Sequence, residues 1–551
     1  MDPAPVTALS PFRSPIFRQV WMASMLSNFG ALIQSVGAAW LMLTLASSAD
    51  MVALVQTSTA LPVMLLSLAA GAMADNLDRR HVLLGAQLFM LLVSVVLAVT
   101  AWFGWLTPWL LLLFTFLIGC GSAFNAPAWQ ASVGDMVPRP QLPGAVALNS
   151  MGFNLARSVG PALGGAIVAA AGAAMAFAIN AASYVALLVV LARWRPALEP
   201  RRLPPETLGS AMLAGVRYVL LSPAIRTVLF RSALFGLAGS ALMALLPLIA
   251  RHRVDGGPLT YGLLLGAFGV GAVVGAMGSA RLRVLLSTET IVRCACLGFA
   301  VATAIAGTST SLPLTMAAQL VAGAGWVLAL STFNVAVQLS TPRWVVARAL
   351  ALYQMSAFGG LAAGSALWGN LAEHQGLPLA LLVGAATMLA CVLLGLVLPI
   401  AQSADLDLDP LRQWKEPATV VPVDARTGPV IVTIEYLIDE ADIVPFLSAM
   451  SERRRIRRRD GAHQWALLRD LGNPRLWIER YKTATWMDYL RHNSRQTKDD
   501  ALVPERLRAL HRGEWPPKVR RMIERQTSRL PGHQSQDPRT DIPSETSAQQ
   551  L

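Results

Sequence analysis

Long apolar stretches separated by short polar segments extend from about residue 17 to residue 400. A helix needs about 20 apolar residues to cross the hydrocarbon core of a bilayer. The pattern therefore predicts an all-α polytopic membrane protein with twelve membrane-spanning helices. They fall at about 17–46, 50–74, 81–104, 107–134, 144–171, 173–193, 225–250, 259–280, 289–308, 312–336, 347–372 and 377–400.

The pattern changes at about residue 400, where polar and charged residues take over. A polar, proline-containing linker at 401–428 leads into a segment at 429–525 in which strand and helix patterns alternate. This alternation predicts a small ferredoxin-like α+β domain. Residues 526–551 are rich in Ser, Gln, Pro and Thr, which predicts a disordered tail. The expected elements are strand 430–437, helix 440–458, strands 463–470 and 475–482, helices 484–495 and 503–512, and a strand near 517–523.

Composition supports a membrane location. Only 14% of the residues are charged and 54% are hydrophobic, whereas a soluble domain carries about 25% charged residues. The N-terminal segment lacks a short apolar core followed by a small-residue cleavage site, so no cleaved signal peptide is expected. The net charge of +13 is attributed to basic loops and predicts no affinity for nucleic acid.

Arginine is distributed unevenly among the loops. Loops of odd number carry only Arg251 and Arg253. Because cytoplasmic loops have an excess of basic residues, both termini are predicted to be cytoplasmic. The predicted halves, 1–193 and 225–400, flank a central cytoplasmic loop at 194–224. The N-terminal segment and the loops of even number carry Arg13, Arg18, Arg79, Arg80, Arg139, Arg193, Arg195, Arg201, Arg202, Arg217, Arg226, Arg281, Arg283, Arg343 and Arg348.

The two halves resemble each other at an offset of 204 residues, and one register aligns four separate segments. A parallel repeat of six plus six spans is typical of transporters whose halves rock about a site near the bilayer midplane. The matching pairs are "GAM" at 71–73 and 275–277, Arg79 and Arg283, "PR" at 138–139 and 342–343, "AVAL" at 145–148 and "ALAL" at 349–352, and Gly160 and Gly165 with Gly364 and Gly369.

The fifth predicted span contains residues that a helix tolerates poorly. Gly152, Ala156, Gly160 and Gly164 recur at every fourth position, which gives a face that a neighbouring helix can approach closely. Pro161 removes a backbone hydrogen bond and can bend the helix. Two interpretations follow: tight packing against another helix, or a flexing point that closes the outer side of a cavity.

Arg157 lies near the middle of the same span. A charged group at this depth costs on the order of 3 kcal/mol or more, so it should face protein or water. The ten acidic residues before position 400 all lie at span ends, in loops or at the terminus. Arg157 is therefore either a structural residue bonded to amides and helix ends, or a residue that binds an anion in a transport cavity.

Four amide side chains lie at comparable depth in the first, fourth and tenth spans. Each could join helices by a hydrogen bond or contact a substrate. The cysteines lie in apolar runs with no histidine or carboxylate nearby, so neither a metal site nor a cofactor is expected. The four amides are Asn28, Gln34, Asn125 and Asn334.

The loop between the second and third spans, "GAMADNLDRRH", resembles the loop signature of the major facilitator superfamily. It departs from that signature at Asn76, where the family has Arg, and at Asp78, where it has Gly. The matching residues are Gly71, Asp75, Arg79 and Arg80.

A closer resemblance, to the enterobactin-exporter-like branch of bacterial efflux proteins, covers nearly the whole chain. It rests on "FRQVW" at 17–21, "NAPAWQA" at 125–131 and the run at 145–165. The segments "VTIEYLID" at 432–439 and "YLRHNSRQTKDD" at 489–500 are similar to a C-terminal extension common in that branch. The predicted domain is also similar to the small dimeric barrels of antibiotic-biosynthesis monooxygenases.

The resemblance implies a fold, a location and roles for particular residues. Spans 1, 4, 7 and 10 line the cavity in the family, which makes the four amides candidate substrate-binding residues beside Arg157. Proton antiport in the bacterial inner membrane is the family expectation, and Asp135 is the candidate coupling residue. The span-5 signature G-P-x-x-G-G of the superfamily's antiporters is matched by Gly160, Pro161, Gly164 and Gly165, which favours export.

The predicted function is therefore secondary transport, and no enzymatic activity is expected. The protein would export a small organic molecule, siderophore-like or drug-like, with anionic compounds among the candidates, by alternating access. One alternative is an importer or lysophospholipid flippase of the same fold. Another is an enzyme that acts through the C-terminal barrel and uses the spans as an anchor. The expected partners are the substrate, the lipid bilayer and protons, and the expected state in the membrane is a monomer.

The loop motif generates a first testable prediction. An acid leaving the second span near Arg79 and Arg80 could hold the cytoplasmic loops together in one conformer and release them in the other. We expect Asp75→Asn to reduce transport while membrane insertion stays normal, as measured by an export assay alongside membrane fractionation. Export at the wild-type rate would refute the gating role.

Overall fold

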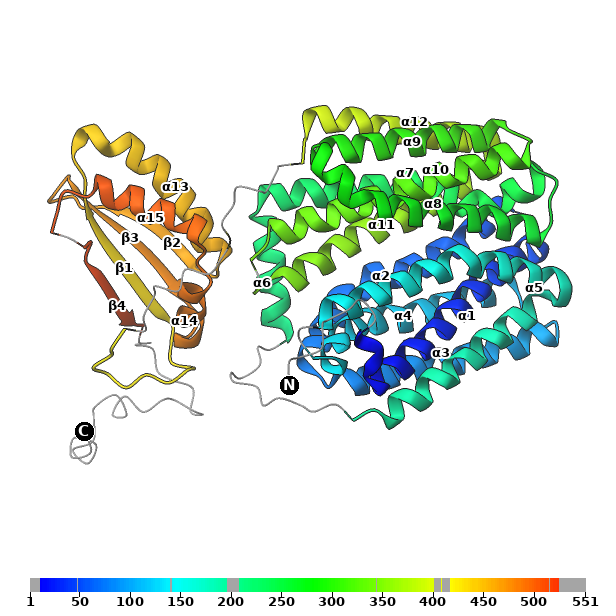
Figure 1. The fold of residues 1–551 in the computed structure, drawn as a ribbon. Helices are drawn as coiled ribbons and strands as arrows, with labels where there is room; N and C mark the ends of the chain where they lie inside the picture. The colour runs from blue at the N-terminus through cyan, green and yellow to red at the C-terminus, as the bar shows by residue number, and fades with distance from the viewer. Residues whose placement is uncertain are drawn as a thin grey trace. The chain divides into compact units, whose positions relative to one another are not determined.

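The computed structural model describes residues 10–46, 48–138, 141–195, 208–342, 344–400, 408, 417–514 and 516–524. It contains two compact units, which are treated separately here (Figure 1). The first consists of 1–213, 224–339 and 347–403, and the second of 214–223, 340–346 and 404–551. Most of the predicted linker and the predicted disordered tail at 526–551 lie outside the described residues.

The first unit is a bundle of long helices (Figure 1). Among the described residues, ten helices are long and apolar enough to cross a membrane. The long helices are α1 (Pro15–Leu45), α2 (Ala49–Asn76), α3 (Arg79–Trp102), α4 (Pro108–Met136), α5 (Leu142–Arg193), α7 (Pro223–His252), α8 (Pro258–Leu285), α9 (Thr288–Thr308), α10 (Leu312–Leu339), α11 (Val346–Gln375) and α12 (Leu377–Val397).

Two helices account for the difference from the twelve predicted spans. α5 has 52 residues, which at 1.5 Å per residue would be more than twice the thickness of a bilayer core. It is divided at Gly172, whose φ of 79° and ψ of 171° are not helical. Only glycine adopts such a backbone conformation readily, so α5 is two helices joined at this residue. α11 is not among the ten apolar helices, although it has 30 residues.

Short polar side chains set where the helices begin. The hydroxyl of Thr107 accepts a hydrogen bond from the backbone N–H of Leu110 at 3.3 Å, and the Ser287 hydroxyl accepts one from Thr290 at 3.2 Å. The Asp78 carboxylate accepts one from the Arg80 N–H at 2.9 Å and so caps α3. These bonds satisfy N–H groups that have no partner within their helix.

The helix starts repeat at the offset seen in the sequence. α4 begins at Pro108 and α10 at Leu312, 204 residues later, and α5 and α11 begin at Leu142 and Val346, also 204 apart. The packing repeats as well. A Cβ placed on Gly160 would lie 3.1 Å from Leu32 of α1, and one on Gly364 would lie 2.4 Å from the Leu237 carbonyl oxygen of α7.

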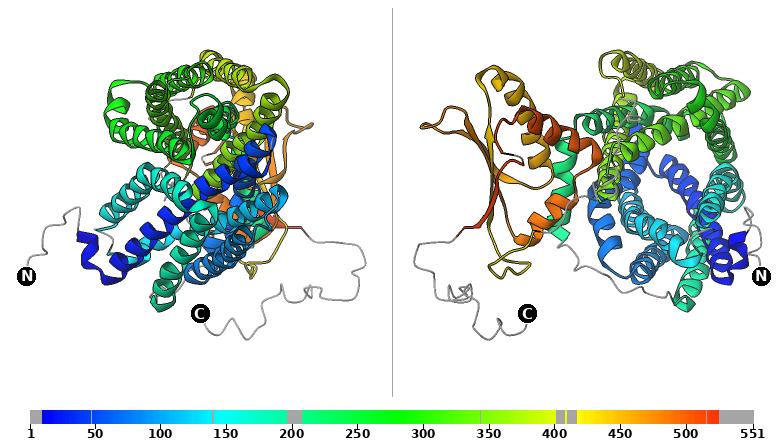
Figure 2. Two further views of the ribbon diagram at one scale, coloured as in Figure 1. Left: turned by 90° about the vertical axis from the view of Figure 1, so that its right-hand side faces the viewer. Right: turned by 60° about the vertical axis from the view of Figure 1, so that its left-hand side comes forward.

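The second unit contains an antiparallel sheet whose strands lie in the order β2-β3-β1-β4. Helices cover one face of this sheet (Figures 1 and 2). Residues of β1 alternate between buried and half-buried, as expected for a strand with one covered face. The elements are β1 (Val430–Leu437), a 3-10 turn (Glu440–Asp442), α13 (Ile443–Arg459), β2 (His463–Arg469), β3 (Leu476–Thr483), α14 (Trp486–Ser494), α15 (Lys498–Leu510) and β4 (Val519–Ile523).

Two elements differ from the sequence prediction. α15 begins at Lys498, five residues before the predicted start at 503, because Thr497 and Asp500 form a reciprocal capping box. In addition, α6 (Leu208–Leu220) lies within the stretch that was expected to be a central loop. Its first residues belong to the first unit, and residues from Ala214 onward belong to the second.

A buried carboxylate organises the core of the second unit. Glu479 on β3 is fully buried and accepts hydrogen bonds from Arg453 at 2.7 Å, Arg457 at 3.3 Å and Trp465 at 3.1 Å. Burial by itself raises the pKa of Glu479, but the charges of both arginines outweigh burial and lower this pKa. The basic run at 453–459 is thus partly turned inward, and only Arg454, Arg455 and Arg458 of it are exposed.

Glu479 therefore provides a stability test. We expect Glu479→Gln to destabilise the unit by about 3 kcal/mol, because two buried guanidinium groups lose their counter-charge. The matched control is Glu452→Gln, which removes an exposed ion pair with Arg506 and should cost at most about 1 kcal/mol. Hydrogen exchange of β3 in the full-length protein measures both.

The same carboxylate predicts a pH dependence. A lowered pKa in the folded state means that Glu479 stabilises the fold above its ordinary pKa of 4.5 and that this contribution is lost as the pH falls. The difference in the hydrogen-exchange rate of β3 between the wild type and Glu479→Gln should therefore become smaller as the pH falls. A constant difference from pH 7 to pH 3 would contradict this assignment.

Candidate functional site

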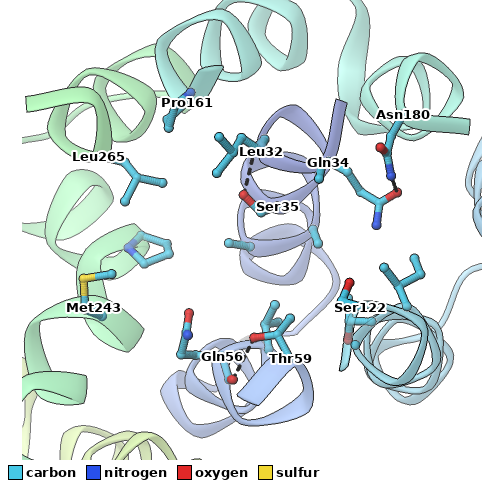
Figure 3. Close-up of a pocket in the computed structure, with 18 of the residues that line it drawn as sticks. Leu32, Gln34, Ser35, Gln56, Thr59, Ser122, Pro161, Asn180, Met243 and Leu265 are labelled. Carbon is cyan, nitrogen blue, oxygen red and sulfur yellow. Dashed lines mark hydrogen bonds between the residues drawn. The ribbon is translucent and has the colours of Figure 1, made fainter. Parts of the chain in front are cut away.

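A cavity of about 430 Å³ lies within the helical unit, between α1, α2, α4, α5, α7 and α8 (Figure 3). This volume is in the range of sites that hold small organic molecules. The wall is mostly apolar, with Leu32 of α1, Met243 of α7 and Leu265 of α8 among its residues. Besides Arg157, the polar side chains that line it are Gln34, Ser35, Gln56, Thr59, Thr115, Ser122, Asn180, Tyr184 and Tyr261.

Gln34 is the centre of a buried hydrogen-bond network on one wall of the cavity. Its carbonyl oxygen accepts from Asn180 Nδ2 at 2.6 Å and from Ser94 Oγ at 3.2 Å, so it joins α1 to α5 and α3 (Figure 3). A Cβ at Gly30 would lie 2.4 Å from Ser183 Oγ, so the absence of a side chain there allows α1 and α5 to come this close. Gln34 thus both connects helices and lines the cavity.

Arg157 of α5 also lines the cavity and is the one charged side chain among the described lining residues. Its guanidinium carbon lies 5.3 Å from the ring centroid of Phe268 on α8, a cation–π distance. Within the described residues, the guanidinium makes no hydrogen bond and no ion pair. Its N–H groups therefore remain available to an acceptor that enters the cavity.

The remaining predicted amides do not reach this cavity. Asn125 accepts a hydrogen bond from Gln87 at 3.0 Å and joins α4 to α3. Asn334 accepts one from Gln338 within α10, and Asn28 is half-buried on α1. Sequence reasoning missed Gln56 and Asn180, because it relied on spans 1, 4, 7 and 10, whereas α2 and the second part of α5 also line the cavity. It also missed Ser122 of α4, because it considered only amide side chains in those spans.

The loop motif fastens the start of α3 to two other helices. Arg79 Nη1 donates to Asp135 at 3.0 Å and to the Ala131 carbonyl at 3.0 Å, both on the last turns of α4. Arg80 donates to the carbonyl of Ala192 at 2.7 Å, at the end of α5. Arg79 and Asp135, to which the sequence analysis gave separate roles, therefore form one pair. The side chain of Asp75, in the last turn of α2, lies outside the described residues.

The loop motif differs between the two halves of the helical unit. A Cβ at Gly71 would meet no atom within 4 Å, so packing does not require glycine there. Arg283, which corresponds to Arg79 in the second half, donates to the hydroxyl of Ser331 at 3.1 Å rather than to a carboxylate. A charged pair is therefore present at this position in the first half alone, among the described residues.

The glycines of α5 lie between α1 and α8. A Cβ at Gly164 would lie 3.0 Å from the Ile33 Cα of α1, and one at Gly165 would lie 2.6 Å from the Pro258 carbonyl oxygen of α8. α8 contributes glycines of its own, because a Cβ at Gly262 would lie 2.5 Å from the Pro161 carbonyl oxygen. The two halves of the bundle thus meet along a seam with almost no side chains.

Further contacts join the two halves near the same end of the bundle. The rings of Trp40 on α1 and Tyr261 on α8 stack with centroids 6.4 Å apart. Arg251 of α7 donates to the Leu43 carbonyl of α1 at 3.3 Å. Glu373 of α11 accepts a hydrogen bond from the backbone N–H of Ala49, at the start of α2. The halves are therefore in contact at the end where α1 meets α2 and α7 meets α8.

The arrangement of the helical unit is that of known membrane transporters. A bacterial homologue of the human lysosomal transporter Spinster, solved in an inward-facing and unoccupied conformation, is 16% identical, and the match covers 70% of this chain and 95% of that one, with a TM-score of 0.54. A POT family transporter in complex with 5-aminolevulinic acid is 12% identical, with 69% and 95% covered and a TM-score of 0.57. The unit thus shares the fold of these transporters.

The family of the chain follows from a comparison of its sequence with models of protein families. The family model of transmembrane secretion effectors matches residues 6–529. Because this match spans most of the chain, the protein belongs to the transmembrane secretion effector family of major facilitator transporters. The resemblance of the sequence to efflux proteins of the major facilitator superfamily is confirmed.

Curated relatives match more than two thirds of the chain. The multidrug efflux pump Tap of Mycolicibacterium fortuitum is 25% identical over 407 residues, which is 71% of this chain and 97% of the relative. The enterobactin exporter EntS of Citrobacter koseri is 28% identical over 417 residues, 74% of this chain and 95% of the relative. Both relatives are named as exporters or efflux pumps.

The seam between α5 and α8 can be tested with one glycine. A Cβ at Gly269 of α8 would lie 2.3 Å from the Arg157 carbonyl oxygen, so Gly269→Ala must push the two helices apart. We expect a clear drop in thermal stability of the purified protein. Gly278→Ala on the same helix, where a Cβ meets nothing within 4 Å, should be neutral or slightly stabilising. Equal melting temperatures for the two variants would contradict the conclusion that close packing of α5 against α8 requires a glycine at position 269.

Proposed function

We propose that this protein exports a small organic molecule across the bacterial inner membrane by alternating access, with the cavity at Arg157 as its binding site. The observation that carries the proposal is a cavity of about 430 Å³ whose lining contains one charged side chain, and this side chain has no polar partner among the described residues. The names of the relatives Tap and EntS favour export over uptake.

The substrate class follows from the chemistry of the lining. Arg157 offers N–H donors to an anionic group such as a carboxylate or phenolate. The rings of Phe153, Tyr261 and Phe268 line the cavity around it and suit a flat apolar body. A siderophore-like or drug-like molecule that combines a negative group with an aromatic ring meets both requirements.

Alternating access is supported by the close seam between the two halves. Loops of odd number carry little Arg, which supports an outer location for the end where α1 meets α2 and places both termini and the α+β domain in the cytoplasm. With that end closed, the cavity would be reached from the cytoplasm, as in the inward-facing neighbour. Gly160, Pro161, Gly164 and Gly165 would then form part of the outer closure.

We also propose the organisation that the sequence predicted. α5 supplies two spans, because it is divided at Gly172. α11 is a further span in this proposal, because its glycines pack against neighbouring helices as those of α5 do. The helical unit then has twelve membrane spans. The strand order β2-β3-β1-β4, with helices after β1 and β3, supports a ferredoxin-like domain at 429–525. A single chain encloses the whole cavity, which supports a monomeric transporter.

Proton coupling is proposed through the pair of Asp135 and Arg79. Protonation of Asp135 would remove the charge that pairs with Arg79 and joins α3 to α4. It would thereby release the junction of α2 and α3, whose sequence motif also contains Gly71, Asp75 and Arg80. Proton entry would then be coupled to substrate export through a single carboxylate, Asp135, which lies outside the cavity.

The role of Arg157 is tested by transport in proteoliposomes with an imposed pH gradient and a panel of anionic and neutral aromatic compounds. We expect Arg157→Gln to lower export of the anionic compounds by about tenfold or more, since a charge-assisted hydrogen bond contributes about 1.5–3 kcal/mol. Arg157→Lys should retain part of this export, because it keeps the charge but not the planar set of donors.

The control is Arg281→Gln, which removes an exposed arginine of α8 outside the cavity. It should export the same compounds at the wild-type rate. If Arg157→Gln also exports anionic compounds as well as the wild type does, the cavity is not an anion site.

A further inference from the structure

The second compact unit includes two short segments from earlier in the chain. Besides residues 404–551, it contains Ala214–Pro223, which leads into α7, and Ser340–Val346, which connects α10 to α11. The first segment lies in the central connection between the two halves, and the second lies within the second half. The second unit therefore combines the α+β domain with two connections that lie far upstream of it in the chain.

An aromatic pair joins the two segments to each other. The rings of Tyr218 and Trp344 lie edge to face with centroids 5.6 Å apart, which is a favourable geometry for aromatic rings. Tyr218 is 2% exposed. Since 126 residues separate the two rings along the chain, their contact is a product of the tertiary structure.

Each ring of this pair also stacks against an arginine of the α+β domain. The Arg459 guanidinium carbon, at the end of α13, lies 4.9 Å from the Tyr218 centroid. The Arg495 guanidinium carbon, just after α14, lies 4.1 Å from the Trp344 centroid. Both distances are within the range of cation–π contacts. The two arginines and two rings thus form a continuous stack.

Acidic residues of the domain hold the stack in place. Arg459 forms ion pairs with Asp460 at 2.9 Å and with Asp500 at 2.7 Å, which orient its planar face toward Tyr218. The turn after α13 uses Gly461, with φ of +117°, and a Cβ there would lie 3.0 Å from Arg217 Nη2. A glycine is therefore required for backbone conformation at a point where segment 214–223 approaches the domain.

The stack is separate from the hydrophobic core of the domain. That core is built on Val432, Tyr436, Phe446, Trp477 and Tyr481, together with neighbouring apolar residues, and includes neither Tyr218 nor Trp344. The domain thus buries its own core without the two segments. The surface that contacts them has the character of a binding surface rather than of a core.

We propose that the α+β domain carries a docking surface, made of Arg459, Asp460 and Arg495, for the chain's own segments 214–223 and 340–346. By binding both segments, the domain holds the connection that precedes α7 next to the connection that joins α10 to α11. The effect on transport rests on the proposed function: helices that must move during alternating access would move together with this pair of connections, so the domain would set the rate of the cycle.

The docking is tested by hydrogen exchange in the full-length protein. We expect Arg495→Ala to accelerate exchange about tenfold in both segments, because loss of the stack on Trp344 also loosens Tyr218. Trp344→Ala should have the same effect, and Trp344→Phe, which keeps a ring, should retain most of the protection. Arg506→Ala, at an exposed ion pair on α15, is the matched control and should change neither segment.

The outcomes are distinct. The proposal holds if exchange rises in 214–223 and 340–346 while β1 and β3 stay protected. It is overturned if segment 214–223 is unaffected by Arg495→Ala and Trp344→Ala, or if β1 and β3 lose protection together with the segments, since the stack would then be part of the domain core.

Transport is measured on the same variants in proteoliposomes. A severalfold change in turnover, with unchanged apparent affinity for substrate, supports coupling of the docking surface to the cycle. If exchange in the two segments becomes faster while turnover is unchanged, the docking contact is supported but its effect on the transport rate is overturned. If the wild-type protein transports none of the compounds, the proposed function fails while the exchange result still decides the docking.

Discussion

The close approach of helix backbones is the constraint on which the helical unit depends. α5 packs against α1 and α8 through glycines, and a single Cβ at Gly165 or Gly262 would overlap a backbone carbonyl of the partner helix. In a membrane no hydrophobic force drives helices together, so van der Waals contact between small residues has to supply the association. The same packing recurs in the second half, at Gly364 and Gly369, which is why the two halves meet in a symmetric way.

This packing decides where the one charge of the cavity lies. Arg157 is on the α5 turn that contacts α8, so its guanidinium lies over Phe268 rather than in lipid. Asn180 donates a hydrogen bond to Gln34 in the same cavity, whereas the Arg157 guanidinium has no polar partner among the described residues. Under the proposed function, the binding energy for an anionic substrate would be concentrated at Arg157, on a mostly apolar wall.

The α+β unit follows a different physical rule. Its core contains Glu479, a full charge that is stable only because Arg453 and Arg457 surround it. Its outer arginines contact aromatic residues of two distant segments. One basic run, 453–459, thus serves both purposes, because positions 453, 456 and 457, which are three and four residues apart, lie on the buried face of the helix and the residues between them face outward.

The sequence by itself determined the membrane class, the 204-residue repeat and the family, because apolar length, periodicity and local motifs are recorded along the chain. It also identified Arg157 and Gln34, since a polar group in an apolar helix stands out. It did not find Asn180 or Gln56 in the cavity wall, the pairing of Arg79 with Asp135, or the inward turn of Arg453 and Arg457. Those depend on which helices become neighbours. Only the tertiary structure decides that, because contacts between distant segments follow from side-chain volume and backbone approach in three dimensions.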